Sequence, residues 1–468
     1  MSGGSEDNSA RVSGPVTGGS KGWAFGGPTT DLTALGYRQD EYFLEGEAVR
    51  YGPRAGTELG RNGRWEVEPV VRSPYKTRLV VVRPTDPAAF NGTVVVLWNN
   101  VSAGYENFAG GDSAEVYEDG FAYAAASVQR VGIHGQPDNP QGLQQWDPER
   151  YASLSIPSDD YSFDIYTQAA NVVAPDRHHD ALDPMGGLEV RRLVAQGASQ
   201  SAARLASYLN GVQPITRRFD AFFFVMYFGG GTPLEVGDAV MTVREAVADA
   251  SQPRIPEGLH LLRDDLDIPI LVLNTECEAT SCYGVRQPDS DRFRYWEVAG
   301  ASHVSLPAMA SSSPRMERDF GFSIPLDETM QGINHVSVAP VVDAALHLLQ
   351  AWMTGGTPPP IQPRIAFDGE PAQIDRDEHG IARGGIRLPQ VEVPLAHNSA
   401  LQQAPDIFAR LVGYHESFPV EKLCELYGDR DTYLARYEEA TRAAAAASIV
   451  LPRDVDPLLA EAEATFPL

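Results

Sequence analysis

Short apolar runs rich in β-branched residues recur along the chain and are bounded by turn-forming residues. Such runs are typical of strands, whereas apolar residues that return every three or four positions are typical of helices. The strand pattern falls on residues 78–84, 92–100, 121–132, 189–197, 219–227, 268–275 and 293–300. The helix pattern falls on residues 113–120, 161–173, 201–212 and 341–356.

The alternation of strands and helices, with several strands apolar on both faces, predicts an α/β fold. Its central sheet is expected to be mostly parallel, with helices on both faces. Residues 1–19 are rich in Gly and Ser and are expected to be disordered, and residues 20–74 have the pattern of short antiparallel strands. We expect a core at residues 75–357, a lid insertion within it at residues 228–265, and a C-terminal extension at residues 358–468 packed on the core.

Charge and length narrow the classes of partner. The chain has 468 residues and a net charge of −26, whereas binding to nucleic acid or to an anionic membrane surface needs a basic surface. No apolar run is long enough to predict a membrane span, and the Gly/Ser-rich start has no apolar segment of the kind that a secretory signal needs. We therefore expect a cytoplasmic location. The pattern leaves the oligomeric state open, with a homodimer as one option.

Motifs for metals and organic cofactors are not found in the sequence. No Gly-rich phosphate loop follows a first strand, and no pair of histidines has helical spacing on a candidate ligand helix. His178 and His179 are adjacent in an Asp-rich segment, where a solvated turn is the simpler interpretation. We expect neither a metal nor a cofactor.

The strand pattern that ends at Gly197 runs into a helix pattern through the segment GASQS, which is centred on Ser199. A nucleophilic serine on a sharp strand-to-helix turn needs small residues two positions to either side, because strand and helix pass close together there. Gly197 and Ser201 meet that need, although the usual G-x-S-x-G pattern has Gly at the second position. The alternative interpretation is that Ser199 is only the N-cap of the helix.

A serine becomes strongly nucleophilic only when a base takes its proton. On this type of fold the base is expected in a loop after the last strand, downstream of the acid. His303 has that position, in a loop of small residues that follows the strand pattern ending at Gly300. His335 is the alternative base, and His134 is a candidate to line the pocket.

The acid is expected to follow the preceding strand, at residues 268–275, where Glu276 and Glu278 are both available. The usual spacing favours Glu278, with Glu276 as a supporting carboxylate or as the alternative acid. A carboxylate here holds the imidazole in the right tautomer and stabilises the imidazolium. Cys277 and Cys282 would stiffen this segment as a disulfide, but two reduced thiols are the favoured interpretation.

Two preorganised N–H donors are needed to stabilise a tetrahedral oxyanion. The amide of Gln200, directly after the serine, is one candidate. The second is expected in the turn after the strand at residues 92–100, from the backbone of Asn100 or Val101. Adjacent asparagines are also ordinary turn residues, and the two interpretations are compatible.

Six segments of the chain, in the right order, resemble a bacterial family whose members are often called alpha/beta hydrolase domain-containing proteins. They are YKTRLVVVRPTDPAAFNGTVVVLWNNVSAG, SVQRVGI, WDPERYASLSIPSDDYSFDIYTQAA, GASQSAARLASYLNGV, RQPDSDRFRYWEVAGASHV and RDEHGIARGGIRLP. The resemblance implies the α/β-hydrolase fold and a serine hydrolase acting on esters, with Ser199, Glu278 and His303 at the motif positions. The chain departs from the family pattern at Leu97, where the family usually has Glu, and at Glu278, where it usually has Asp.

These residues and the resemblance favour a carboxylesterase that acts on a small-molecule ester through an acyl-enzyme intermediate. The pocket mouth is expected under the insertion and beside Trp146 and Tyr151, whose rings would suit a hydrophobic ester but serve as often in packing. A lactonase, a C–C bond hydrolase or an acyltransferase would use the same triad. A further alternative is a binding protein that has kept the fold without catalysis.

Overall fold

The computed structural model describes residues 10–108, 113–137, 140–177, 182–236, 259–326, 330–400 and 407–467. The chain divides into two compact units, unit 1 at Met1–Ile270 and unit 2 at Leu271–Leu468. This division cuts the predicted core, residues 75–357, at residue 270. The last part of that core groups with the C-terminal extension, because the two share the hydrogen bonds described below.

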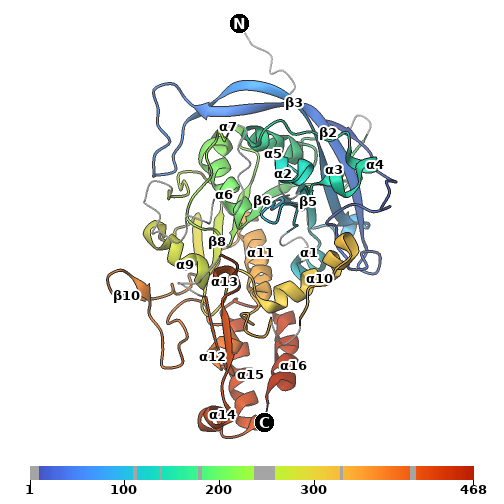
Figure 1. The fold of residues 1–468 in the computed structure, drawn as a ribbon. Helices are drawn as coiled ribbons and strands as arrows, with labels where there is room; N and C mark the ends of the chain where they lie inside the picture. The colour runs from blue at the N-terminus through green and yellow to red at the C-terminus, as the bar shows by residue number, and fades with distance from the viewer. Residues whose placement is uncertain are drawn as a thin grey trace. The chain divides into compact units, whose positions relative to one another are not determined.

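Unit 1 begins with three antiparallel strands, β1 (Arg11–Ser13), β2 (Tyr37–Pro53) and β3 (Val67–Pro84). β2 and β3 are the long blue strands of Figure 1. The predicted disorder at residues 1–19 is wrong for β1, which pairs with β2, while residues 1–9 lie outside the described residues. The predicted boundary at residue 74 is also wrong, because β3 runs through it from a mostly exposed first half into a buried second half.

Contacts from distant residues explain why the Gly/Ser-rich segment after β1 is ordered. The guanidinium of Arg150 donates to the carbonyl oxygens of Val16 and Gly18. The carboxylate of Asp147 accepts from the amide of Lys21 at 3.0 Å. These partners lie more than a hundred positions away in sequence. The composition of the segment alone therefore predicts disorder, whereas these tertiary contacts order it.

The sheet of unit 1 continues from β3 in the order β5 (Ala122–Ala126), β4 (Thr93–Trp98), β6 (Arg192–Ala198) and β7 (Ala221–Val225). β3 and β5 are antiparallel, and the pairs from β5 to β7 are parallel. Nearly every side chain of these four strands is buried, as expected for a parallel sheet covered on both faces. Parallel pairing of β4 with β6 places the C-terminal ends of both strands at one edge of the sheet.

The α-helices described in unit 1 alternate with its strands along the chain. They are α1 (Ala114–Glu118), α2 (Arg130–His134), α3 (Leu143–Trp146), α4 (Pro148–Tyr151), α5 (Ser162–Asn171), α6 (Gln200–Ser207) and α7 (Gln213–Thr216). Short 3₁₀ turns are η1 (Pro87–Ala89) and η2 (Asp159–Tyr161), and a π-helical turn, η3 (Tyr208–Val212), joins α6 to α7.

The helical pattern at residues 201–212 continues past Asn210, through η3 into α7. The Asn210 side chain donates to the carbonyl of Leu261 and accepts from the amide of Arg263, both at 2.9 Å. Asn210 therefore holds the last part of the predicted lid, at residues 261–263. Of the predicted lid, residues 237–258 lie outside the described residues, and its described ends contain neither helix nor strand.

Unit 2 opens with β8 (Ile270–Thr275), whose neighbour in the sheet is β9 (Phe293–Val298). Between them lie helix α9 (Glu276–Cys282) and the 3₁₀ turn η6 (Tyr283–Val285), and after them α10 (Leu306–Phe320) and α11 (Ala339–Met353). The strands and α11 match the sequence pattern. The segment with both candidate acids follows β8, as predicted, and forms the first turn of α9.

The C-terminal extension adds short strands, several α-helices and a 3₁₀ turn to unit 2. They are β10 (Phe367–Asp368), β11 (Gln373–Ile374), α12 (Pro389–Glu392), β12 (Ala396–Ser399), α13 (Ile407–Val412), β13 (Tyr414–Ser417), α14 (Val420–Tyr427), α15 (Arg430–Ala446), η8 (Pro452–Asp454) and α16 (Val455–Thr465). The extension contacts β9: Ile386 forms a bridge with Val298, and the indole of Trp296 donates to the carbonyl of Pro360 at 2.9 Å. None of the helices described in either unit has the length and apolar composition needed to cross a bilayer.

Candidate active site

Ser199 lies between the end of β6 and the start of α6 with a strained backbone. Its φ is 57° and its ψ is −118°, a conformation that L-residues other than Gly rarely adopt. Such a conformation costs about 1–3 kcal/mol and persists only where neighbouring structure enforces it. Here the Ser199 amide donates to the carbonyl of Val225 at 3.0 Å, and its carbonyl accepts from the amide of Ala203.

The small residues around Ser199 are required by the close approach of β6 and α6. A Cβ on Gly197 would lie 2.8 Å from the carbonyl oxygen of Ser201, closer than real contacts allow. Ser201 is fully buried, and its hydroxyl donates to the carbonyl of Ala198 at 2.9 Å. Serine fits here because its hydroxyl folds back onto β6. The side chain of Ser199 itself makes no capping hydrogen bond to α6, so the simple N-cap interpretation is not supported.

Of the two alternatives for a backbone donor in the turn after β4, Asn100 and Val101, the structure favours Val101. The backbone amide of Asn100 already donates to the carbonyl of Asn107 at 3.1 Å. Its side chain instead donates to the carbonyl of Ala198 at 2.9 Å and ties this turn to the end of β6. The amide of Val101 has only a long contact, 3.4 Å, with the side-chain oxygen of Gln200. Val101 and Gln200 remain the candidate donors, the second at the first helical position, where amides have no partner within the helix.

A buried chain of hydrogen bonds holds the Gln200 side chain, and the sequence pattern did not reveal it. Gln200 donates to the side-chain oxygen of Gln129 at 3.1 Å, and Gln129 donates to Asp159 at 3.1 Å. The indole of Trp98 also donates to Gln129, at 3.0 Å. Gln129 follows β5 and Asp159 begins η2, so no local motif links them to the serine turn.

Glu278 and His303 form a buried pair in unit 2. His303 Nδ1 lies 2.6 Å from Glu278 Oε1, and the side chains are 8% and 0% exposed. Burial alone would raise the pKa of Glu278, but the His303 charge and hydrogen bonds from His303 and Thr275 hold it below its usual range. Of the two candidate acids, Glu278 is the one that binds this imidazole.

The helix start at α9 fixes the Glu278 carboxylate. Thr275 is the N-cap of α9, and its amide and hydroxyl both donate to Glu278 Oε2, at 2.8 and 2.6 Å. This is a capping box, in which the N-cap and the third helical residue satisfy each other's backbone groups. One carboxylate oxygen thus faces the helix start and leaves the other for His303. The T-x-x-E pattern at residues 275–278 is a local sequence signal for the start of this helix.

Glu276 is occupied by other partners. Its Oε2 accepts from the amide of Gly300 at 2.9 Å, and its Oε1 accepts from Arg376 and from the amide of Ala400. Burial raises the pKa of Glu276, and the charge of Arg376 limits that rise. Glu276 is therefore the supporting carboxylate of the two glutamates, bound to the loop that carries His303.

The other two candidate histidines have structural partners. His335 stacks on His415 with ring centroids 3.6 Å apart, and burial lowers the pKa of both imidazoles. His134 Nδ1 lies 2.9 Å from the Gln144 side chain, and its Nε2 accepts from the amide of Ile156. Both ring nitrogens of His134 are thus used to join the segments around α3, which argues against a pocket-lining role.

Tyr151 and Trp146 pack inside unit 1. Tyr151 is fully buried, and its hydroxyl donates to Glu41 at 2.8 Å in the network around the buried Arg78. Trp146 packs edge-on against Phe25, with ring centroids 5.1 Å apart. For Tyr151 the prediction of a pocket-lining role is wrong, because its ring and hydroxyl are both used in the core.

Cys277 and Cys282 are separate buried thiols and not a disulfide. Burial raises the pKa of Cys282 to about 12 and that of Cys277 well above its usual value. Thiols of this kind are poor nucleophiles and poor metal ligands, because the thiolate is the reactive form.

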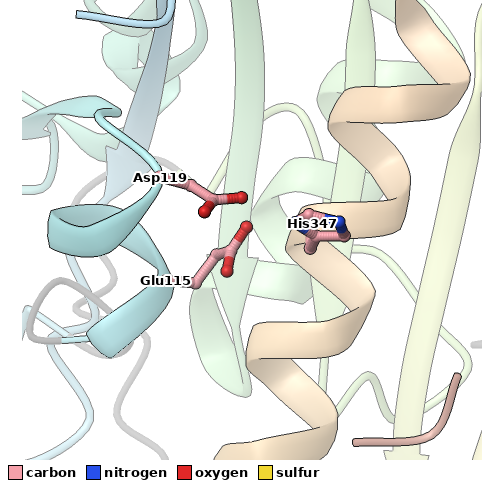
Figure 2. A group of neighbouring side chains, drawn as sticks. All are labelled: Glu115, Asp119 and His347. Atoms are coloured by element: carbon pink, nitrogen blue, oxygen red, sulfur yellow. The ribbon is translucent and has the colours of Figure 1, made fainter. Parts of the chain in front are cut away.

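Candidate metal ligands are shown in Figure 2. Glu115 lies on α1 and Asp119 is the C-cap residue directly after it, both in unit 1, and His347 lies on α11, in unit 2. Within the described residues of either unit taken alone, no three ligand atoms cluster. We therefore assign no metal site. His178 and His179, the other histidines considered for a metal, lie outside the described residues.

Comparison with known proteins gives one match over nearly the whole chain. A model of the family described as "Alpha/beta hydrolase domain" matches residues 12–460. The curated proteins gave no match.

Several solved structures are similar to the chain at low identity. Esterase Est22 is 13% identical, with 57% of this chain and 74% of that chain covered and a TM-score of 0.31. A prolyl endopeptidase is 12% identical, with 57% and 36% covered and a TM-score of 0.28. Oligopeptidase B from Trypanosoma brucei is 12% identical, with 56% and 33% covered and a TM-score of 0.28. The chain spans about a third of the length of these peptidases, and at these TM-scores the likeness carries no argument about function.

Proposed function

The chain belongs to the alpha/beta hydrolase domain family, and from that premise we propose that it is a serine hydrolase that cleaves carboxylic esters. The observation that carries the proposal is the backbone of Ser199, a non-glycine residue at a φ of 57° between β6 and α6. Strain of this kind is retained where it has a use, and here it presents the hydroxyl at the edge of the sheet.

In the proposed mechanism Ser199 Oγ attacks the ester carbonyl carbon while His303 takes the hydroxyl proton. Glu278 holds His303 Nδ1–H and stabilises the imidazolium that forms. The amides of Gln200 and Val101 donate to the oxyanion, and His303 returns the proton to the leaving alcohol. Water, with His303 again as base, then adds to the acyl-enzyme, and the carboxylic acid leaves.

The proposal is tested by Ser199→Ala against p-nitrophenyl butyrate and a fluorophosphonate probe. We expect kcat to fall by about 10⁴-fold or more and the covalent label to disappear, because no other nucleophile replaces the hydroxyl. The matched control is Ser201→Gly, which removes a neighbouring hydroxyl and restores the usual G-x-S-x-G pattern. It is expected to retain labelling. Labelling that persists in Ser199→Ala would contradict the proposal.

A substrate panel separates the ester hydrolase from the related activities. Hydrolysis of simple alkyl esters faster than lactones, with no gain of transfer product when an alcohol is added, supports the carboxylesterase. Acyl transfer to the added alcohol that exceeds hydrolysis would assign the triad to an acyltransferase instead.

A further inference from the structure

Glu276 stands out in unit 2 because it is a fully buried carboxylate that joins three segments of the chain. One oxygen accepts from the amide of Gly300, in the loop that follows β9. The other accepts from Arg376 and from the amide of Ala400, both in the C-terminal extension. A single side chain thus connects the start of α9, the loop that carries His303, and the extension.

The link between α9 and the loop runs in both directions. The amide of Gly300 donates to Glu276 Oε2 at 2.9 Å, and the amide of Glu276 donates to the carbonyl of Ala301 at 3.2 Å. Glu278 lies two residues after Glu276, and His303 lies three residues after Gly300. The 2.6 Å contact between Glu278 and His303 is therefore built on the same pair of segments.

The loop is also held from its other side. Asn334 donates from its side chain to the carbonyl of Gly300 at 2.7 Å, and the carbonyl of Asn334 accepts from the amide of Leu306 at 2.8 Å. The carbonyl of Gly300 is thus held by the neutral side-chain amide of Asn334, and its N–H by the carboxylate of Glu276. Of these two hydrogen bonds, the one to the carboxylate depends on charge.

Arg376 supplies the charge that Glu276 needs. A buried carboxylate without a counter-charge is costly and tends to take up a proton. Arg376 is partly exposed, with 25% of its side chain accessible, and it also donates to the carbonyl of Gly380 at 3.1 Å. It therefore reaches from the extension into the interior of unit 2, where its charge favours the ionised form of Glu276 and limits the rise in pKa that burial causes.

We propose that Glu276 and Arg376 are positioning residues that set the Glu278–His303 hydrogen bond, so that the C-terminal extension takes part in catalysis through Arg376. The predicted effect on turnover rests on the function proposed above. The hydrogen bonds on which the proposal is built all lie within unit 2.

The kinetic test compares Arg376→Met, Arg376→Lys and the double variant Glu276→Gln/Arg376→Met with p-nitrophenyl butyrate. Arg376→Met is expected to lower kcat by about 10- to 100-fold with KM nearly unchanged, because a small displacement of the acid–base pair slows the chemical step. Arg376→Lys keeps the charge and is expected to be intermediate. The double variant removes the unpaired charge and is expected to recover roughly threefold or more over Arg376→Met.

The pH dependence of kcat separates positioning from a general loss of structure. In Arg376→Met the loss of kcat is expected to grow as pH rises, because the ionised form of Glu276 is the one that lacks its counter-charge. Two of the described titratable groups interact with this pair. Burial is the main cause that raises the pKa of Cys277, with the Glu276 charge as a smaller one, and burial followed by the Arg376 charge lowers the pKa of His397. The variants Cys277→Ser and His397→Asn are therefore made in the Arg376→Met background. If a new ionisation in the pH profile persists in both, it is assigned to Glu276.

Arg286→Met is the matched control. Arg286 pairs with Glu297, a buried glutamate on β9 that also accepts from a backbone amide of the extension, Ile365, at 2.9 Å. The chemistry is the same, but Glu297 does not bind the loop at Gly300. We expect Arg286→Met to lose thermal stability comparably and to keep kcat within roughly threefold. Equal losses of kcat in both variants, or a wild-type kcat in Arg376→Met, would overturn the proposal.

A spectroscopic readout keeps the test independent of the proposed activity. A proton shared in the short Glu278–His303 hydrogen bond gives a far-downfield NMR resonance. That resonance is expected to shift or broaden in Arg376→Met and to return in the double variant, whether or not the protein cleaves esters. Its persistence in Arg376→Met would overturn the positioning role, while a wild-type protein without esterase activity but with the expected NMR response would overturn only the proposed function.

Discussion

The nucleophile region of unit 1, around the proposed nucleophile Ser199, and the acid–base region of unit 2, around the proposed pair Glu278 and His303, hold these side chains by different means. Ser199 is placed by main-chain geometry: a positive φ, a glycine two residues earlier and a backbone hydrogen bond to Val225. Glu278 and His303 are placed by side chains, with carboxylates as the central acceptors. The first region is therefore sensitive to volume and the second to charge.

The difference follows from what each region must do. A serine needs exposure at the end of a strand, which steric constraints on the backbone supply without any ionised group. A carboxylate that stabilises an imidazolium must stay ionised while buried, which requires donors for each oxygen and a compensating charge. The predictions below test whether volume and charge can be separated in this way.

The largest effect is expected from Glu278→Gln in the acid–base region. The variant keeps the shape of the side chain but removes the charge and favours the wrong imidazole tautomer, so kcat should fall by about 10⁴-fold. Steady-state kinetics with p-nitrophenyl butyrate measure it. Glu297→Gln, a neutralised buried glutamate on β9, serves as control and should stay close to wild type. A kcat for Glu278→Gln within tenfold of wild type would contradict the claim that the function of this region depends on the charge of Glu278.

The next largest effect is expected from Gly197→Ala in the nucleophile region. The added methyl would lie 2.8 Å from the Ser201 carbonyl, so β6 or α6 must shift, at a cost of about 1–3 kcal/mol in the free energy of unfolding. Activity should fall about 100-fold through displacement of Ser199. Thermal unfolding and probe labelling measure both. Gly60→Ala, whose Cβ would meet only an ordinary contact at 3.5 Å, is the control, and equal effects of the two substitutions would contradict the steric account.

We expect the two glutamates of α9 to contribute to the free energy of unfolding with opposite pH dependences. The pKa of Glu278 is held below its ordinary 4.5, so this residue contributes stability that is present above pH 4.5 and is lost as pH falls through the folded-state pKa. The pKa of Glu276 is raised, so its contribution is present below 4.5 and is lost as pH rises. Urea unfolding of Glu278→Gln and Glu276→Gln across pH checks the two signs. Parallel curves for both variants would contradict the assignment, and Ser199→Ala should show no such trend.

The smallest effect is expected from reducing agent. Cys277 and Cys282 are separate buried thiols, so the acid region is held by hydrogen bonds and not by a cross-link. The melting temperature with and without reductant should agree, and titration of the unfolded, unreduced protein should find all three thiols of the chain. Detection of a single thiol would show a disulfide and replace the hydrogen-bond account with a covalent one.

Sequence reasoning succeeded where the determinants are local. The strand, small residues and helix around Ser199 lie within a short segment, and their periodicity predicts the turn that the structure contains. The order of β8, the acidic pair, β9 and His303 is likewise a local pattern. The same reasoning could not choose between Asn100 and Val101, because the hydrogen bond from the Asn100 amide to Asn107 depends on how that loop closes and leaves no periodic pattern in the sequence.

Contacts distant in sequence account for the remaining differences. Arg376 lies 100 positions after Glu276, and no spacing rule connects the two. Order after β1 depends on Asp147 and Arg150, and the buried role of Tyr151 depends on Glu41. The capping box at Thr275 is the exception, a local signal present in the sequence that was not used to predict α9.

The most direct test of the central claim is the rate of fluorophosphonate labelling of Ser199 in the wild type and in His303→Ala, with the labelled peptide identified by mass spectrometry. We expect the wild type to label on Ser199 and His303→Ala to label at least about 10³-fold more slowly while unfolding normally, because the serine loses its base. A His303→Ala variant that labels Ser199 at the wild-type rate would contradict the proposal that His303 is the base for Ser199.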